Sequence, residues 1–335
     1  MMGQFINEST MDKSTSVGQK KAGIQSLRMI GKFIRNQPIW LVVILCLIIF
    51  GLSSPYFFTV SNLSDVLLQS SIIGFIAIAM TFIILNANID LTVGSLLALS
   101  ANIVVGFESH GMVLAVLASL LAGVVIGAIN GFFVTRAGIN SFIVTLGAML
   151  GVRGLVFVLT KQQSFVAENP ALSNFGALQL GPISIIVIFF LVFVVIGQWV
   201  LKKTSHGRNA IAIGGNYDAA LNAGVRVKLH IFINFIVSGI MASVAGIMMA
   251  SEMGAATPTL GTDYELWSIT AVVLGGTKLQ GGFGSVIRTL GGVLVIGILR
   301  NGMDLLHVQS YYVLVLMGVI LIAVIFIDKQ VSRAK

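Results

Sequence analysis

Few residues in this 335-residue chain are of the types that perform catalysis or bind metals. The four histidines are far apart in the sequence, and no H-E-x-x-H spacing places two imidazoles on one face of a helix. The nearest glycine cluster, Gly275-Gly276-Thr277-Lys278, lacks the Lys-Ser/Thr pair with which a phosphate-binding loop holds a nucleotide and magnesium. We therefore predict that the chain is not an enzyme and binds no cofactor.

Asp90 and Arg153 are charged residues within apolar sequence, where ionisable groups usually have a function. Asp90 could face a transport cavity, but the favoured prediction is that it caps the following helix and accepts from the backbone N–H of Thr92 or Val93. Arg153 could be a buried hydrogen-bonded strut, line a cavity, or extend its guanidinium to the membrane surface. Residue types alone do not choose among these three roles.

The elements that hold these residues are predicted to be membrane-spanning helices. Hydrophobic residues make up 56% of the chain and charged residues 10%, whereas a soluble domain carries roughly 25% charged residues. The 37 glycines and only 5 prolines suit closely packed transmembrane helices. We predict an all-α membrane protein with about ten transmembrane helices, at roughly 39 to 58, 66 to 86, 95 to 107, 112 to 134, 142 to 160, 183 to 201, 231 to 251, 266 to 275, 285 to 300 and 312 to 327.

Basic residues predict the orientation of these segments. Most of the 20 Lys and Arg residues fall in the N-terminal tail and in alternate loops, which the positive-inside rule places in the cytoplasm. The net charge of +8 is thus a topology signal rather than a mark of nucleic-acid binding. We expect a multi-pass protein of the bacterial inner membrane, with cytoplasmic tails at 1–38 and 328–335 around a permease domain at 39–327. In the first tail, an amphipathic helix and a solvated basic arm both fit the spacing.

Two predicted segments are too short to cross the membrane as simple helices. Residues 95 to 107 give about 20 Å of helix against about 30 Å of hydrocarbon, and residues 266 to 275 give less. Each adjoins a polar or glycine-rich interruption, at 86 to 95 and at 275 to 285. If segments two to five and seven to ten form inverted halves, the interruptions occupy equivalent places, as at a translocation site. The candidates for the path are Asn88, Asp90, Thr92, Gly275, Gly276 and Thr277.

Glycines recur every fourth residue in two of the predicted helices. One row contains Gly123, Gly127 and Gly131, and a second contains Gly147 and Gly151. Such rows allow the backbones of two helices to come into contact. We expect both rows to serve helix packing rather than to line a pore.

The longest predicted cytoplasmic loop, at 202–230, contains a short helical stretch. Asp218 to Ala223 favours a helix, and Gly224 stands where a C-terminal glycine would end it. Small residues bracketed by basic residues at the membrane surface could form a knob that docks a soluble partner. Considered by itself, however, the stretch is more simply interpreted as a solvated turn.

This loop resembles the coupling loop of bacterial ABC importer permeases, in which an acidic residue and two alanines are followed by a glycine four positions later. Asp218-Ala219-Ala220 with Gly224 matches that pattern. More specifically, the chain resembles permeases of ribose- and galactose-type sugar importers over most of residues 40 to 328. It departs from their pattern at Ala87, Asn88 and Arg288, where glycines are expected, at Lys278, where a small polar residue is expected, and at Trp267, where a polar or acidic residue is expected. The matching blocks are 89 to 95, 212 to 216 with 218 to 220, 264 to 266, 271 to 277, and 301 to 302.

The resemblance implies the transmembrane permease subunit of an ABC importer that moves a monosaccharide by alternating access. ATP would be hydrolysed by cytoplasmic ATPase subunits that dock on Asp218, Ala219, Ala220 and Gly224. It also implies a periplasmic or extracellular sugar-binding protein and a second permease copy or paralogue. The alternatives are another small polar solute, such as an autoinducer, nucleoside or branched-chain amino acid, and a stand-alone secondary transporter that needs no ATPase.

Bulky residues in the coupling loop should uncouple transport while the protein remains in the membrane, because they change the surface on which the ATPase docks. We expect Ala220→Leu combined with Gly224→Leu to abolish solute uptake by cells, with a normal amount of permease in the membrane fraction. Normal uptake by this double variant would contradict the docking role.

Overall fold

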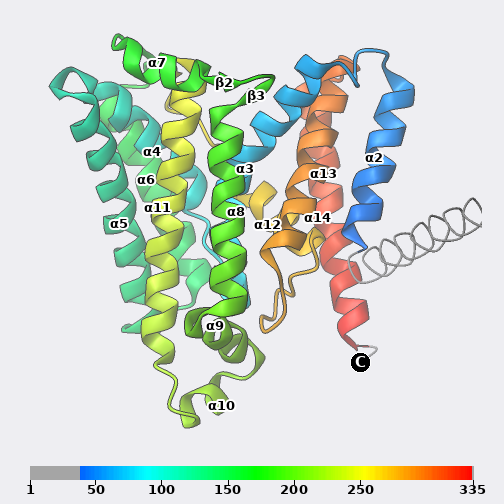
Figure 1. The fold of residues 1–335 in the computed structure, drawn as a ribbon. Coiled ribbons are helices and arrows are strands. Elements are labelled where there is room, and N and C mark those ends of the chain that lie inside the picture. The colour runs from blue at the N-terminus through cyan, green and yellow to red at the C-terminus, as the bar shows by residue number, and fades with distance from the viewer. Residues whose placement is uncertain (1–37, 334–335) are drawn as a thin grey trace, which may run out of the picture.

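The computed structural model describes residues 38–333 (Figure 1), so the expected helix or arm within 1–37 lies outside the described residues. Among the described residues, six helices are long and apolar enough to cross a membrane: α3 (Val60–Leu85), α5 (Met112–Thr135), α6 (Ser141–Thr160), α8 (Ile185–Lys203), α11 (Val227–Met253) and α13 (Val286–Leu305). Three shorter apolar helices accompany them, α2 (Ile39–Ser53), α4 (Val93–Gly106) and α12 (Tyr264–Leu274), together with α14 (Ser310–Arg333), whose apolar part is Ser310–Phe326. The chain is therefore a multi-span membrane protein.

These helices follow the order of the predicted apolar segments, but several boundaries differ. The first helix ends at Ser53 instead of continuing to 58, because the chain turns before Thr59. The Thr59 side chain accepts from the backbone N–H of Asn62 at 3.4 Å, so α3 begins at Val60 rather than 66. The third and eighth predicted segments are short, as expected, with 14 residues in α4 and 11 in α12.

Smaller elements cover the two ends of the helical body (Figure 1). At one end lie the 3-10 helix η1 (Glu108–His110), the helix α7 (Pro170–Ala177) and two short antiparallel strand pairs, β1 (Phe165–Val166) with β4 (Ala255–Ala256) and β2 (Gln179–Leu180) with β3 (Ile183–Ser184). At the other end lie α9 (Ser205–Gly215) and α10 (Tyr217–Asn222). Within the described residues, the all-α prediction is therefore right except for these four two-residue strands.

Helix α3 lies at the centre of the helical body and is buried over most of its length. It packs against α8, α11, α12 and α13, and its side chains Phe75, Ile76 and Met80 are fully buried. Helices α4, α5, α6 and α11 lie on one side of it, and α2, α13 and α14 on the other (Figure 1). The loop that follows α3 is therefore placed where the two sides meet.

The first glycine row packs α5 against α11, as predicted. A Cβ atom at Gly127 would overlap the carbonyl oxygen of Phe235, and one at Gly123 would overlap that of Gly239. The second row does not pack in this way, because a Cβ atom at Gly147 or Gly151 would meet no described atom within 4 Å. For that row, the predicted packing is wrong within the described chain.

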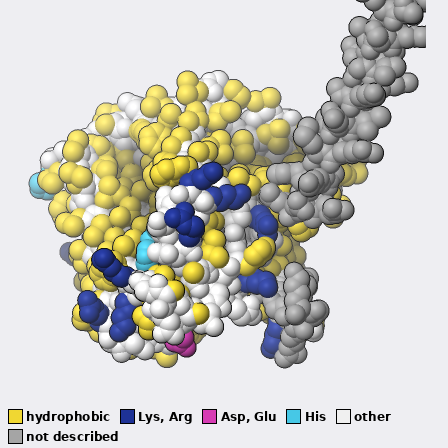
Figure 2. Space-filling view, turned by 60° about the horizontal axis from the view of Figure 1, so that its bottom comes forward, with side chains coloured by type: hydrophobic (Ala, Val, Ile, Leu, Met, Phe, Trp, Pro, Cys, Tyr) yellow, Lys and Arg dark blue, Asp and Glu magenta, His cyan; other side chains and the backbone are white. Residues whose placement is uncertain are grey.

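Basic side chains gather at the end of the molecule that carries α9 and α10. Figure 2 shows this end with Lys and Arg side chains grouped on it and hydrophobic surface around them. Such a border between basic and apolar surface is typical of the cytoplasmic boundary of a membrane protein. We call this end the coupling end below.

A leucine at position 127 should force α5 and α11 apart, because overpacking a tight helix contact costs about 1–3 kcal/mol. We expect Gly127→Leu to lower the thermal midpoint of the detergent-solubilised protein. Gly147→Leu makes the same change of size at a glycine with open surroundings and should leave the midpoint near that of the wild type. Equal shifts for the two variants would show that the glycine contact has no special role.

Candidate translocation and coupling site

Asp90 lies in the link between α3 and α4 and joins three helices. Its side chain is 1% exposed. One carboxylate oxygen accepts from the backbone N–H of Thr92 at 3.0 Å and from the Thr92 hydroxyl, and the other accepts from the hydroxyl of Ser238 on α11 at 2.7 Å. The Thr92 hydroxyl in turn accepts from the amide of Asn130 on α5 at 3.0 Å. Asp90 therefore ties the start of α4 to α5 and α11.

The predicted hydrogen bond from the backbone of Thr92 to Asp90 is confirmed, but Asp90 is not the N-cap. Helix α4 begins at Val93, so the N-cap is Thr92, whose side chain makes no capping bond. Both side chains are about 1% exposed, so they face no open cavity in this conformation. Their part in the transport path stays a prediction.

The two short helices meet at their N-terminal ends. A Cβ atom at Gly94 in α4 would overlap the carbonyl oxygen of Gly261 and the carboxylate of Glu265 in α12. From this point α4 runs toward the end that carries α7, and α12 runs toward the coupling end (Figure 1). The positive ends of two helix dipoles thus lie together inside the helical body.

Arg153 and Glu265 border this meeting point. The Arg153 guanidinium donates to the carbonyl oxygens of Pro258 at 2.9 Å and Leu260 at 2.8 Å, so it braces the segment that leads into α12. Of the three roles left open for Arg153, these contacts are those of the hydrogen-bonded strut. Among the described residues, one carboxylate oxygen of Glu265 has no hydrogen-bond partner. This carboxylate is a polar group next to two helix N-termini; it lies in the matching block at 264 to 266 but was not among the predicted path residues.

The second interruption follows α12. Gly275 packs so closely on α13 that a Cβ atom would press on the backbone of Arg288, and Gly276 has a φ of 86°, which favours glycine. The Thr277 hydroxyl is buried without a hydrogen-bond partner among the described residues. The backbone N–H of Gly282 donates to the carbonyl oxygen of Leu85, the last residue of α3, at 3.0 Å. The two interruptions, far apart in sequence, are therefore joined directly.

The link after α3 contains an alanine in an unusual conformation. Ala87 is exposed and has a φ of 56°, in the left-handed region that glycine adopts at little cost. This is one of the three positions at which the family pattern led us to expect glycine. The backbone conformation explains that expectation.

The predicted short helix of the coupling loop is present. Asn216 caps α10, its side chain accepting from the backbone N–H of Ala219 at 2.9 Å. Gly224 has a φ of 81° just beyond the end of the helix, as predicted. Asp218 and Ala219 are exposed, whereas Ala220 is buried. The helix projects from the coupling end (Figure 1) and offers an exposed face to a partner.

Helix α9 brings the coupling loop into contact with both interruptions. A Cβ atom at Gly214 would overlap the carbonyl oxygen of Leu85 and the backbone nitrogen of Gly282. Only a glycine allows this approach, so α9 lies directly against the hydrogen bond that joins the interruptions. Gly214 lies in the matching block at 212 to 216, but this contact could not be predicted, because Gly214 differs from neighbouring glycines only in the backbone that lies opposite it.

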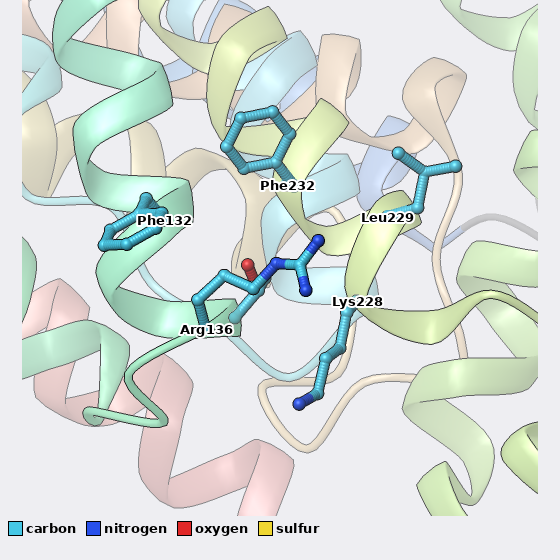
Figure 3. A pocket seen from close by; sticks show the side chains of 6 residues that line it. Phe132, Arg136, Lys228, Leu229 and Phe232 are labelled. Carbon is cyan, nitrogen blue, oxygen red and sulfur yellow. The ribbon is translucent and has the colours of Figure 1, made fainter.

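Two adjoining cavities open at the coupling end. One, of about 590 Å³, lies between Phe132 and Arg136 at the end of α5 and Lys228, Leu229 and Phe232 at the start of α11 (Figure 3). The other, of about 540 Å³, is also lined by Arg136 and Lys228 and reaches the first interruption. Of the predicted path residues, the second cavity is lined by Asn88.

Polar residues on apolar helices carry several of these contacts and were missed in the sequence. Asn130 and Ser238 each lie in a long apolar helix and are buried and hydrogen-bonded to the Asp90 cluster. A buried polar group in a membrane helix needs a partner, so an isolated Asn or Ser within an apolar run was the available signal. Sequence could not identify which partner it meets.

Comparison with known proteins gives consistent relatives. The family described as branched-chain amino acid transport system / permease component matches residues 62–325. The chain is 37% identical over 289 residues to the D-allose transport system permease protein AlsC of Escherichia coli K12, which covers 85% of this chain and 89% of that relative. It is 39% identical over 304 residues to the ribose import permease protein RbsC of the same strain, with 87% and 92% covered.

A third relative is the L-arabinose ABC transporter permease protein AraH of Azospirillum brasilense, 35% identical over 294 residues, with 85% of this chain and 86% of that relative covered. No solved structure matches the chain. The chain therefore belongs to the BPD_transp_2 family of ABC importer permeases, multi-pass proteins of the bacterial inner membrane. Within that family it is a permease of the carbohydrate-uptake type. It is a non-catalytic transport subunit without a cofactor, and a partner ATPase hydrolyses the ATP.

Removal of the Asp90 carboxylate should destabilise the fold, because it leaves buried donors on Thr92 and Ser238 without an acceptor. We expect Asp90→Ala to reduce the free energy of unfolding by about 2 kcal/mol or more, measured as a lower thermal midpoint in detergent. Asp304→Ala, at an exposed carboxylate, is the matched control and should change the midpoint little. A stable Asp90→Ala protein that fails only in transport would instead favour a direct role in the path.

Proposed function

We propose that this chain is the permease of an importer that moves a monosaccharide inward by alternating access. The proposal is supported by the similarity to permeases named for ribose, D-allose and L-arabinose over most of each chain. The observation that carries the mechanism is the contact of Gly214 on α9 with both Leu85 and Gly282. Movement of the coupling loop would act at once on both interruptions.

The coupling loop would receive that movement from the ATPase. Asp218, Ala219, Ala220 and Gly224 form the proposed docking surface, with Ala220 anchoring α10 and Asp218 and Ala219 exposed on it. The charge of this end suits a cytoplasmic location, and we place both termini on the same side. Two ATPase subunits would bind a pair of permeases formed by this chain with a second copy or a paralogue.

The path would run along the interruptions. Asn88, Asp90, Thr92, Gly275, Gly276 and Thr277 are the proposed path residues, with the N-terminal ends of α4 and α12 near its middle. The opposite directions of α4 and α12 support the proposal of inverted halves, in which half-helix N-termini face the solute near the centre of the membrane. Amide, hydroxyl and carboxylate groups there would bind sugar hydroxyls weakly, because tight binding would prevent release.

Other subunits would deliver the sugar and supply the energy for its transport. A periplasmic or extracellular binding protein would present the sugar at the end that carries α7, and closure of the ATPases on ATP would favour one of the two permease conformations. In energetic terms, each partner shifts the equilibrium by its difference in affinity for those conformations.

Reconstitution tests the proposal directly. Vesicles that contain the permease, the ATPase and the binding protein should take up a labelled monosaccharide from a panel of ribose, allose and arabinose, and uptake should require ATP and all the subunits. Vesicles with the permease alone should not concentrate any sugar. Uphill uptake by the chain alone would instead favour a secondary transporter, and uptake only of a nucleoside or amino acid would overturn the sugar assignment.

A further inference from the structure

The two histidines of the predicted coupling loop at 202–230 meet in the structure although they are 24 positions apart in the sequence. His206 on α9 and His230 on α11 lie with their Nδ1 atoms 2.9 Å apart and their ring centroids 4.9 Å apart. The Nε2 atom of His230 is 2.9 Å from the side-chain amide nitrogen of Asn209, one turn along α9 from His206. The pair thus joins two helices at the coupling end.

The hydrogen bonds continue from this pair to the end of α3. The Nε2 atom of His206 is 2.7 Å from the side-chain oxygen of Asn234 on α11. The Asn234 amide donates to the side-chain oxygen of Asn86, and the Asn86 amide donates to the backbone carbonyl oxygen of Ala210 at 2.9 Å. The chain of bonds therefore starts and ends on α9 and passes through α11 and α3.

The groups at the two ends of this chain, the Ala210 carbonyl and the Asn209 amide nitrogen, together fix the direction of every bond between them. A backbone carbonyl can only accept, so Asn86 donates to Ala210, and the oxygen of Asn86 accepts from Asn234. The oxygen of Asn234 is then free to accept from Nε2–H of His206. The Asn209 amide nitrogen can only donate, so Nε2 of His230 accepts from it and the hydrogen of His230 is on Nδ1. His230 therefore donates from Nδ1 to Nδ1 of His206, and each ring nitrogen of the pair has one hydrogen-bond partner.

The inner part of this network is enclosed. Asn234 is 2% exposed and Asn86 is 5% exposed. The ring of Phe82 on α3 lies beside His206, with the ring centroids 6.3 Å apart. His206 and Asn234 also border an apolar cavity of about 200 Å³, whose lining includes Phe82. Because the Asn234 and Asn86 side chains are buried, a broken hydrogen bond between them is costly, so these bonds favour one arrangement of the helices.

The network ends at the first interruption. Asn86 is the C-cap of α3, and its backbone carbonyl accepts from the side-chain amide of Asn88 at 2.9 Å. A displacement of α9 would therefore be passed to the residues that begin the interruption, by directed hydrogen bonds as well as by the contact at Gly214.

We propose that His206, His230, Asn234 and Asn86 are positioning residues that make α9 and the end of α3 move together, so that ATPase movement becomes solute movement. This role rests on the proposed function, because it assumes that the coupling loop receives the ATPase. None of these four residues is among the proposed path residues or the proposed docking residues. Loss of the network should lower the amount of solute moved per ATP hydrolysed, while the permease still binds the solute and the ATPase.

Replacement of His206 tests the role with reconstituted permease, ATPase and binding protein. In His206→Leu, Asn234 loses its donor and His230 loses its acceptor. In His206→Gln, a neutral amide supplies one donor and one acceptor in place of the two ring nitrogens. His110→Leu is the control, because His110 is an exposed histidine at the other end of the molecule. The readouts are ATP hydrolysis, solute uptake and their ratio.

We expect His206→Leu to lower the solute moved per ATP by about fivefold or more, the lower end of typical coupling effects. ATP hydrolysis and copurification of the ATPase should persist, His206→Gln should restore most of the ratio, and His110→Leu should match the wild type. Asn209→Ala removes only the outermost bond at a partly exposed residue. This variant should also lower the solute moved per ATP, and it provides the test if His206→Leu fails to fold.

The outcomes separate this inference from the proposed function. If the wild-type complex shows no ATP-driven sugar uptake, the proposed function fails first. If the wild type transports and both His206→Leu and Asn209→Ala keep its ratio, the network has no positioning role. A His206→Gln variant as uncoupled as a folded His206→Leu would also overturn the proposal, because the hydrogen bonds would then not be what matters.

Discussion

Hydrocarbon offers no hydrogen-bond partner to a backbone group, so a helix that stops within the membrane must find partners in the protein. The last carbonyl of α3 and the carbonyls that lead into α12 find such partners in segments distant in sequence. Gly282 donates to the carbonyl of Leu85, and Arg153 donates to the carbonyls that precede α12. This requirement joins the two interruptions to each other and determines the arrangement of the site.

Close approach of backbones is the second condition for this arrangement. At Gly94, Gly127 and Gly214 an added Cβ atom would overlap the backbone of another segment. These contacts hold α4 to α12, α5 to α11, and α9 to the interruptions. Because backbone contacts of this kind deform little, the parts they connect are suited to move as units, and α9 is thereby placed to act on both halves of the chain.

Much of the architecture could be predicted from the sequence, because it follows from local properties. The apolar runs gave the order of the helices, the interruptions gave the short α4 and α12, and Gly224 gave the end of α10. The contacts of the site could not be predicted in the same way. Asp90 bonds to Ser238, and His206 to His230, across helices that are adjacent only after folding. Glycine spacing alone also could not predict packing: Gly147 and Gly151 have the same spacing as Gly123 and Gly127, but a Cβ atom at either would meet no described atom within 4 Å.

The left-handed backbone of Ala87 has a consequence for the energetics of the link after α3. A non-glycine residue in that region costs about 1–2 kcal/mol, and the side chain is exposed, so its own packing does little to offset this cost. The resting shape of the link is therefore imposed by its neighbours. The left-handed backbone at Ala87 therefore makes the observed shape of the link less stable, by that amount, than the same shape with glycine at this position.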